Sequence, residues 1–211
     1  MTDRTRTTTV KDDAPAARLP RTKPAEVRLE ELMAAAEALF LEQGFEATTI
    51  SEIVERAQVA KGTFYHYFES KSEMLDALAQ RYTSSFLDRL QQAVDACDAD
   101  DWLGRLRAWI RTNIETYAAT YRTHDIVYAN HHHHDRGNAD KNAILVQLGA
   151  ILDGGVRAGA WRLAHPDVTA LLIYAGVHGA TDHVIAAPET DRAAFVDAVV
   201  GDCLRMLGIG A

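Results

Sequence analysis

The sequence predicts an all-α fold in two parts, a small N-terminal three-helix domain and a larger C-terminal helical domain. Apolar residues recur at spacings of three and four over most of the 211 residues, and this is the period of an amphipathic helix. No convincing run of alternating strand residues and no sequence repeat occurs. Glycine, threonine and proline stand where helices would end or begin, so the elements can be delimited in order.

Composition indicates a folded protein of the cytoplasm. Apolar residues make up 47% of the chain, which is enough to fill a core. No apolar run reaches the roughly 18 residues that span a bilayer, and the polar start lacks the apolar core of a secretion signal. Cys97 and Cys203 are the only cysteines and lie far apart in helical surroundings, so we expect reduced thiols.

The charge distribution points to a local anionic target. A net charge of -8 argues against indiscriminate coating of nucleic acid, because that affinity comes from Lys and Arg. Yet Met1 to Arg28 holds seven basic against four acidic residues, and the stretch from Arg56 to Phe68 has two basic residues and no acid. Residues 1–25 show no apolar periodicity, so we expect a disordered arm that is either a solvated tail or a contact to phosphate.

The first two predicted helices carry clear end signals. From Glu26 the apolar residues follow a helical period, and Gly44 then stands where a C-cap glycine would. Thr48 or Thr49 begins the next helix, and Glu52 lies three residues after Thr49, which is the spacing of a capping box.

The stretch "QVAKG" separates this helix from "TFYHYF", and a longer helix follows from Ser70 or Lys71 towards Cys97. Two short helices joined by about three residues have the layout of a helix-turn-helix, whose second helix enters the DNA major groove. At helical spacing Phe64, Phe68 and Tyr67 face inward. The residues expected to face DNA are Lys61, Thr63, Tyr65 and His66. Gly62 would let the backbone approach phosphate closely, and Lys71 would bind a phosphate.

The segment "FLEQGFEATTISEIVERAQVAKGTFYHYFESKSEMLDAL" resembles the DNA-binding domain of TetR-type transcriptional regulators. The resemblance implies a DNA-binding domain at residues 26–86 and an effector-binding and dimerisation domain at residues 87–211. It also implies a homodimer that binds a palindromic operator, usually as a repressor, and is released by a small molecule. The DNA contacts that it implies are Thr49, Ser51, Lys61, Gly62, Thr63, Tyr65, His66, Tyr67 and Lys71.

Two positions depart from the common pattern of this family. Gln58 occupies a turn position where glycine is frequent, and Ala60 stands where a hydroxyl often caps the recognition helix. Losing that cap would cost on the order of 1 kcal/mol of local helix stability.

The C-terminal half reads as further helices, among them Trp102 to Arg122, Ile144 to Val156 and one after each of Pro166 and Pro188. The last two, predicted at residues 168–186 and 191–207, have apolar faces and small residues that suit a four-helix dimer interface. A pocket for an apolar or aromatic effector is expected among the C-terminal helices. Its candidate lining residues, each of which could equally be core, are Trp109, Tyr117, Tyr121, Tyr128 and His178.

The run "NHHHHDRGN" is a separate oddity. His131, His134 and Asp135 would share a face of a helix and could bind a metal ion, although the flanking residues look like a loop. A metal-responsive regulator is therefore an alternative, as is a DNA-binding module without a ligand. An enzyme is disfavoured, because the chain has no HExxH, no phosphate-binding glycine loop, no nucleophile elbow and no paired Glu-x-x-His motif. No cofactor is expected.

Overall fold

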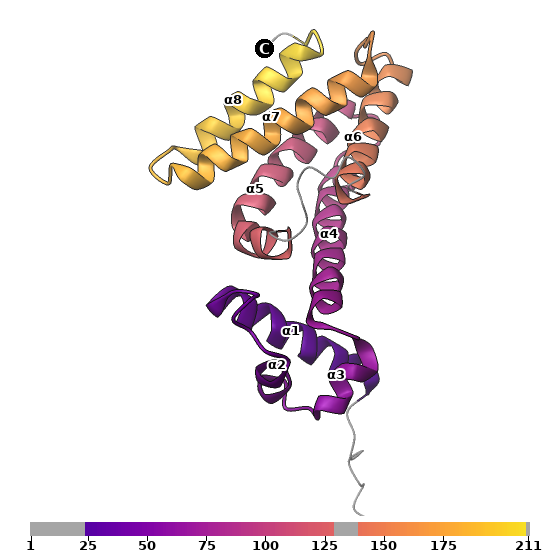
Figure 1. Cartoon of the computed structure of the whole chain (residues 1–211). Coiled ribbons are helices and arrows are strands. Elements are labelled where there is room, and N and C mark those ends of the chain that lie inside the picture. The colour runs from indigo at the N-terminus through magenta and orange to yellow at the C-terminus, as the bar shows by residue number, and fades with distance from the viewer. Residues whose placement is uncertain (1–23, 129–138, 210–211) are drawn as a thin grey trace, which may run out of the picture.

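The computed structural model describes residues 24–128 and 139–209, and in these ranges it has eight α-helices and no strand (Figure 1). The all-α prediction is confirmed. The predicted arm and the His131–Asp135 run lie outside the described residues. No helix in the described ranges has the length and hydropathy needed to cross a membrane. The helices are α1 (Ala25–Gln43), α2 (Ile50–Arg56), α3 (Lys61–Tyr67), α4 (Lys71–Asp95), α5 (Trp102–Tyr128), α6 (Ala139–Arg157), α7 (Pro166–Ala186) and α8 (Arg192–Met206).

The predicted end of α1 and the predicted start of α2 are both confirmed. Gly44 ends α1 with a φ of 85°, and its amide donates to the Phe40 carbonyl at 2.9 Å. Thr49 caps α2, because its hydroxyl accepts from the Glu52 amide at 3.2 Å while the Thr49 amide donates to the Glu52 carboxylate at 2.7 Å. These local bonds satisfy orphan backbone donors at the start of α2.

Gln58 adopts the left-handed backbone conformation, with a φ of 55°. It lies in the turn between α2 and α3, at the position where the sequence departs from the glycine of similar domains. For a residue with a Cβ atom, this conformation costs roughly 1–2 kcal/mol of steric energy. Glycine avoids the steric cost but loses more backbone entropy on folding, which costs about 0.5–1 kcal/mol.

We therefore expect Gln58→Gly to raise the free energy of unfolding by on the order of 0.5 kcal/mol, and Gln58→Val to lower it, because a β-branched side chain tolerates positive φ least. Thermal unfolding of the two variants beside the native protein measures both effects. Equal melting temperatures for all three proteins would contradict the strain inferred at this turn.

Two clusters of buried side chains share α4. The lower cluster joins α1, α2 and α3 to the first half of α4, and the upper cluster joins its second half to α5, α6, α7 and α8. Tyr82, in the middle of α4, packs against both clusters. The boundary predicted at residues 86 and 87 lies within this continuous helix, so α4 joins the two clusters directly.

The C-terminal end of α5 also reaches the lower cluster. Val127 and Tyr128 are buried there, and the Tyr128 hydroxyl is hydrogen-bonded to the Thr83 hydroxyl of α4. Arg122 donates to the Leu41 carbonyl of α1 at 3.3 Å. The helix that was predicted to end at Arg122 thus continues for two more turns and contacts α1.

The last two helices begin differently from each other. Pro166 is the first residue of α7, which therefore begins two residues before the predicted start at residue 168 and ends at Ala186 as predicted. The next helix, predicted at residues 191–207, begins at Arg192, so Pro188 lies before its first turn. Asp191 caps α8 by accepting from the Ala194 amide at 3.2 Å, and Pro188 lies in the connection that precedes this cap.

Candidate nucleic-acid interface

Helix α3 is held in place by its phenylalanines. It has only seven residues, too few for a stable isolated helix. Phe64 is 0% exposed and Phe68 is 7% exposed, and both belong to the same cluster as Ile53 and Val54 of α2. The predicted inward orientation of Phe64 and Phe68 is confirmed, and it fixes which side of α3 remains available to a partner.

The opposite side of α3 presents polar and aromatic side chains. Lys61, Gly62 and His66 are exposed, Tyr65 is 53% exposed, and Thr63 is half-buried. A Cβ atom added at Gly62 would meet nothing within 4 Å. The fold itself therefore does not require glycine at this position, and the backbone there is open to close approach by an external partner. Helix α2 adds the exposed Thr49 and Ser51.

The local charge is smaller than the sequence suggested. Arg56 forms an ion pair with Glu42 of α1 at 2.8 Å, so its charge is partly neutralised. Within the described ranges Lys61 has no ion-pair partner. Glu52 accepts hydrogen bonds from the Thr49 side chain and amide and from Gln43, and these bonds lower its pKa. A single unpaired lysine beside neutral donors suits a short phosphate contact and base-edge hydrogen bonds.

Tyr67 connects α3 to the start of α1. Its hydroxyl donates to the Ala25 carbonyl at 2.8 Å, and its ring lies 4.9 Å from that of His66. The side chain is half-buried, in line with the predicted inward position. In this arrangement Tyr67 orients α3 and His66, while its own predicted DNA contact stays a prediction.

The structure places Lys71 in a role that the sequence did not indicate. Its ammonium donates to the carbonyls of Phe45 at 2.5 Å, Thr48 at 2.8 Å and Glu46 at 3.4 Å, and it lies 4.2 Å from the centroid of the Phe45 ring. All three ammonium donors are thereby directed into the connection between α1 and α2. Contact with a DNA phosphate would require the ammonium to leave these carbonyls.

Helix α3 begins without a side-chain cap. Ala60 is the N-cap residue and makes no side-chain hydrogen bond, as its chemistry dictates. The amides at the start of α3 therefore have one acceptor fewer than in α2, where Thr49 supplies it. Such amides are able to bind an anionic oxygen from outside.

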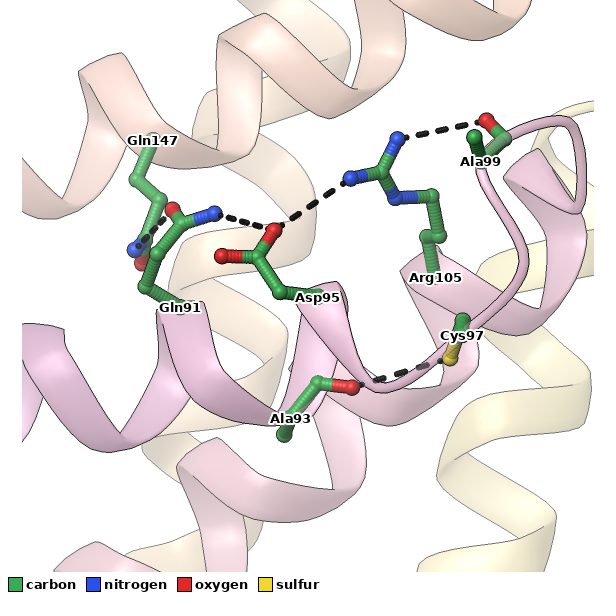
Figure 2. A network of polar contacts seen from close by, with 7 residues as sticks. All are labelled: Gln91, Ala93, Asp95, Cys97, Ala99, Arg105 and Gln147. Carbon is green, nitrogen blue, oxygen red and sulfur yellow. Dashed lines mark hydrogen bonds and ion pairs between the residues drawn. The ribbon is translucent and has the colours of Figure 1, made fainter.

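Among the candidate effector-binding residues, Trp109 is completely buried. Its indole nitrogen donates to Gln147 of α6 at 3.0 Å. Figure 2 shows how Gln147 continues through Gln91 to Asp95, which also accepts from Arg105 at 3.4 Å. This network ties α4, α5 and α6 together, so Trp109 has a structural role in the core.

Three other candidates form part of an aromatic cluster between α4, α5 and α7. The Tyr117 ring stacks on His178 with centroids 5.0 Å apart, and His124 bridges Tyr117 to Tyr128. The Tyr117 hydroxyl donates to Asp182 at 3.2 Å. Burial and the neighbouring Asp182 carboxylate raise the pKa of Tyr117, so the phenol stays protonated. Tyr121 is half-buried against the upper cluster.

Two cavities in the described part of the chain lie beside α4. One, of about 310 Å³, lies between α4 and α5 beside α1, and the other, of about 400 Å³, lies between α4, α5 and α6. Their lining does not include Trp109, Tyr117, Tyr121, Tyr128 or His178. The predicted effector contacts of these five residues therefore stay predictions. No group of three or more His, Cys, Asp or Glu side chains in the described ranges could hold a metal ion.

A short helix anchored by phenylalanines, with donors on its outer side and a helical bundle behind it, has the arrangement of a helix-turn-helix DNA-binding domain. Residues 32–78 match the family model described as "Bacterial regulatory proteins, tetR family". At residues 32–78 the chain thus carries the helix-turn-helix domain of the TetR family.

Several characterised transcriptional repressors are similar to the chain. The HTH-type transcriptional repressor NemR of Escherichia coli strain K12 is 31% identical over 88 residues, which are 42% of this chain and 44% of NemR. The matched stretch of the chain thus spans less than half of that relative's length. A structure titled as a SmeT–triclosan complex has a TM-score of 0.67 at 23% identity and covers 85% of this chain and 90% of SmeT, the repressor of a Stenotrophomonas maltophilia multidrug efflux pump. FadR of Bacillus subtilis in complex with stearoyl-CoA has a TM-score of 0.66 at 19% identity, covering 86% of this chain and 98% of FadR.

Proposed function

We propose that the protein is a ligand-responsive transcriptional repressor that binds a palindromic DNA operator as a homodimer. The observation that carries this proposal is the exposed side of α3. It combines an unpaired lysine, a glycine that the fold does not require, and an aromatic ring that is 53% exposed, all on a helix fixed by two buried phenylalanines. A regulator of chromosomal genes would act in the cytoplasm.

In this proposal Lys61 and the α3 amides bind phosphate, and the neutral side chains of α3 reach base edges in the major groove. Gly62 permits the backbone to approach the DNA, and Tyr67 and Lys71 mainly support the geometry of the domain. The proposed contact set is Thr49, Ser51, Lys61, Gly62, Thr63, Tyr65 and His66, with Tyr67 and Lys71 beside it.

The proposed dimer interface lies on α7 and α8. Large apolar side chains are exposed there, among them Leu172 at 54% and Met206 at 49%. A Cβ atom added at Gly176 or Gly179 would meet nothing within 4 Å, so a partner helix can approach the α7 backbone closely. A two-fold dimer uses α3 twice, on half-sites about one helical turn apart, which gives a short helix enough contact for specificity.

We infer that a small organic molecule, apolar or aromatic in part, releases the DNA. The similar proteins SmeT and FadR have been captured with triclosan and stearoyl-CoA, which supports an organic effector for this chain. A ligand changes DNA affinity only by binding better to a conformation whose two α3 helices no longer match the operator. The α4 helix, which belongs to both clusters of buried side chains, is the proposed connection.

Selection of bound duplexes from a random DNA pool at about 0.15 M salt tests the proposal, because this salt concentration suppresses non-specific electrostatic binding. The full chain is expected to enrich an inverted repeat. A matched variant with Lys61→Ala and Tyr65→Ala, two exposed residues, is expected to fold normally and to enrich nothing. If the native protein enriches no sequence, or if the variant enriches the same repeat equally well, the proposed recognition by α3 is wrong.

A further inference from the structure

The cavity between α4 and α5 combines basic, hydroxyl and apolar side chains at the junction with α1. It has a volume of about 310 Å³, at the lower end of the size of small-molecule sites. Helix α4 contributes one face at helical spacing, and α5 contributes three threonines at positions i, i+4 and i+7. The lining consists of Leu78, Arg81, Tyr82, Ser85, Phe86 and Arg89 of α4, Thr116, Thr120 and Thr123 of α5, and Glu37 of α1.

Basic side chains outnumber acidic side chains among the residues that line the cavity. Two guanidinium groups, those of Arg81 and Arg89, line it against the single carboxylate of Glu37. Within the part of the chain that the structure describes, Arg89 has no ion-pair partner. Guanidinium is planar and matches a carboxylate with two parallel hydrogen bonds. The cavity therefore offers an unused site for an anionic head group.

Arg81 is engaged with α1 through bonds that a ligand can replace. It forms ion pairs with Glu37 at 2.7 Å and with Glu30 at 3.1 Å. The Glu30 side chain is largely exposed, so its ion pair with Arg81 contributes little net stability, whereas the Glu37 side chain is only about one third exposed. A ligand carboxylate that is shared between Arg81 and Arg89 would substitute for the bond to Glu37.

The remaining lining suits the rest of such a molecule. Leu78 and Phe86 give apolar contact, and Ser85 is exposed beside them. The Tyr82 and Thr120 hydroxyls are hydrogen-bonded to each other at 3.0 Å, which fixes the wall between the two arginines and α5. Few polar groups in an apolar setting are what gives a small-molecule site its orientation and specificity.

We propose that this cavity binds an organic carboxylate, with its head group on Arg81 and Arg89 and its apolar body against Leu78 and Phe86. Binding removes Glu37 from Arg81. Glu37 also accepts from Thr123 of α5 at 3.4 Å, so the freed carboxylate loosens α1 from both α4 and α5. The effect on DNA rests on the proposed repressor function, whereas the binding of the carboxylate does not.

Calorimetry on the full chain without DNA tests the site, with 4-phenylbutyrate and octanoate as probes and 4-phenylbutyramide, octanamide and 4-phenylbutylamine as controls. At least one acid is expected to bind with a Kd below about 1 mM, at least tenfold more tightly than its amide. Arg89→Gln should weaken this binding at least tenfold, and Glu37→Gln should strengthen it. Arg107→Gln, which replaces an exposed arginine of α5 outside the cavity, should leave the affinity unchanged.

The proposal is overturned if neither acid binds, if an amide or the amine binds as tightly as the acid, or if Arg89→Gln binds the acid like the native protein. A second titration uses the DNA duplex selected by the native protein, and the acid is expected to weaken its binding for the native chain but not for Arg89→Gln. If no duplex is selected while the acid still binds, the repressor function fails and the carboxylate site stands. If the duplex binds and the acid does not, the site fails and DNA recognition stands.

Discussion

Gly62→Ala is expected to leave the protein as stable as the native chain, or more stable, while its affinity for the operator falls at least tenfold. An alanine Cβ at this position would meet no protein atom within 4 Å, and replacing glycine in a helix contributes roughly 0.5–1 kcal/mol to stability. In the proposed complex, the DNA backbone is the group that the added methyl would meet. Thermal unfolding and fluorescence anisotropy with a labelled operator measure the two effects.

Gly149→Ala is the matched control for this variant. Gly149 lies in α6, and a Cβ added there also meets nothing within 4 Å. It should therefore stabilise the chain similarly without changing DNA affinity. If Gly62→Ala binds the operator as tightly as the native protein does, the close approach of the α3 backbone to DNA is wrong.

Lys71→Met is expected to lower the free energy of unfolding by about 2 kcal/mol, because hydrogen bonds from a charged donor are worth roughly 1.5–3 kcal/mol each and partly buried carbonyls would lose theirs. The side chain holds three carbonyls of the connection between α1 and α2. For a chain of this size the loss corresponds to a fall in melting temperature of about 4–8 °C.

Lys61→Met is the companion variant: it tests the proposed DNA contact of Lys61, whereas Lys71→Met tests the structural role of Lys71. Lys61 is exposed and has no ion-pair partner within the described ranges, so this change should leave the melting temperature unchanged. It should reduce the dependence of operator affinity on salt by about one unit of logarithmic slope per protomer. The assignment would be reversed if Lys71→Met kept full stability and instead lost the salt dependence.

The sequence predicted those features of the DNA-binding domain that depend on neighbours in the chain. Gly44 ends α1 and Thr49 with Glu52 caps α2, because each cap is formed within four residues. The burial of Phe64 and Phe68 follows from helical spacing alone. Gln58 was singled out as unusual from the pattern, and its positive φ gives the physical reason.

The features that the sequence did not predict depend on residues far apart in the chain. Lys71 reaches a carbonyl 26 residues earlier, and Arg81 reaches a carboxylate 44 residues earlier. Helical periodicity places each side chain on a face of its own helix but does not tell which helix covers that face. The start of α8 was predicted to within one residue for a local reason, since Asp191 caps the helix and Pro188 only marks the turn before it.

In the proposed complex, the two α3 helices of one dimer bind two half-sites at a fixed separation. The most direct measurement is the affinity of the protein for a series of duplexes in which one to ten base pairs are inserted between the half-sites of the selected repeat. Affinity is expected to fall steeply on insertion of a few base pairs, because the second α3 can then no longer reach its half-site in the same orientation. Affinity that does not depend on the insertion would contradict the paired arrangement and would indicate a single helix-turn-helix acting alone.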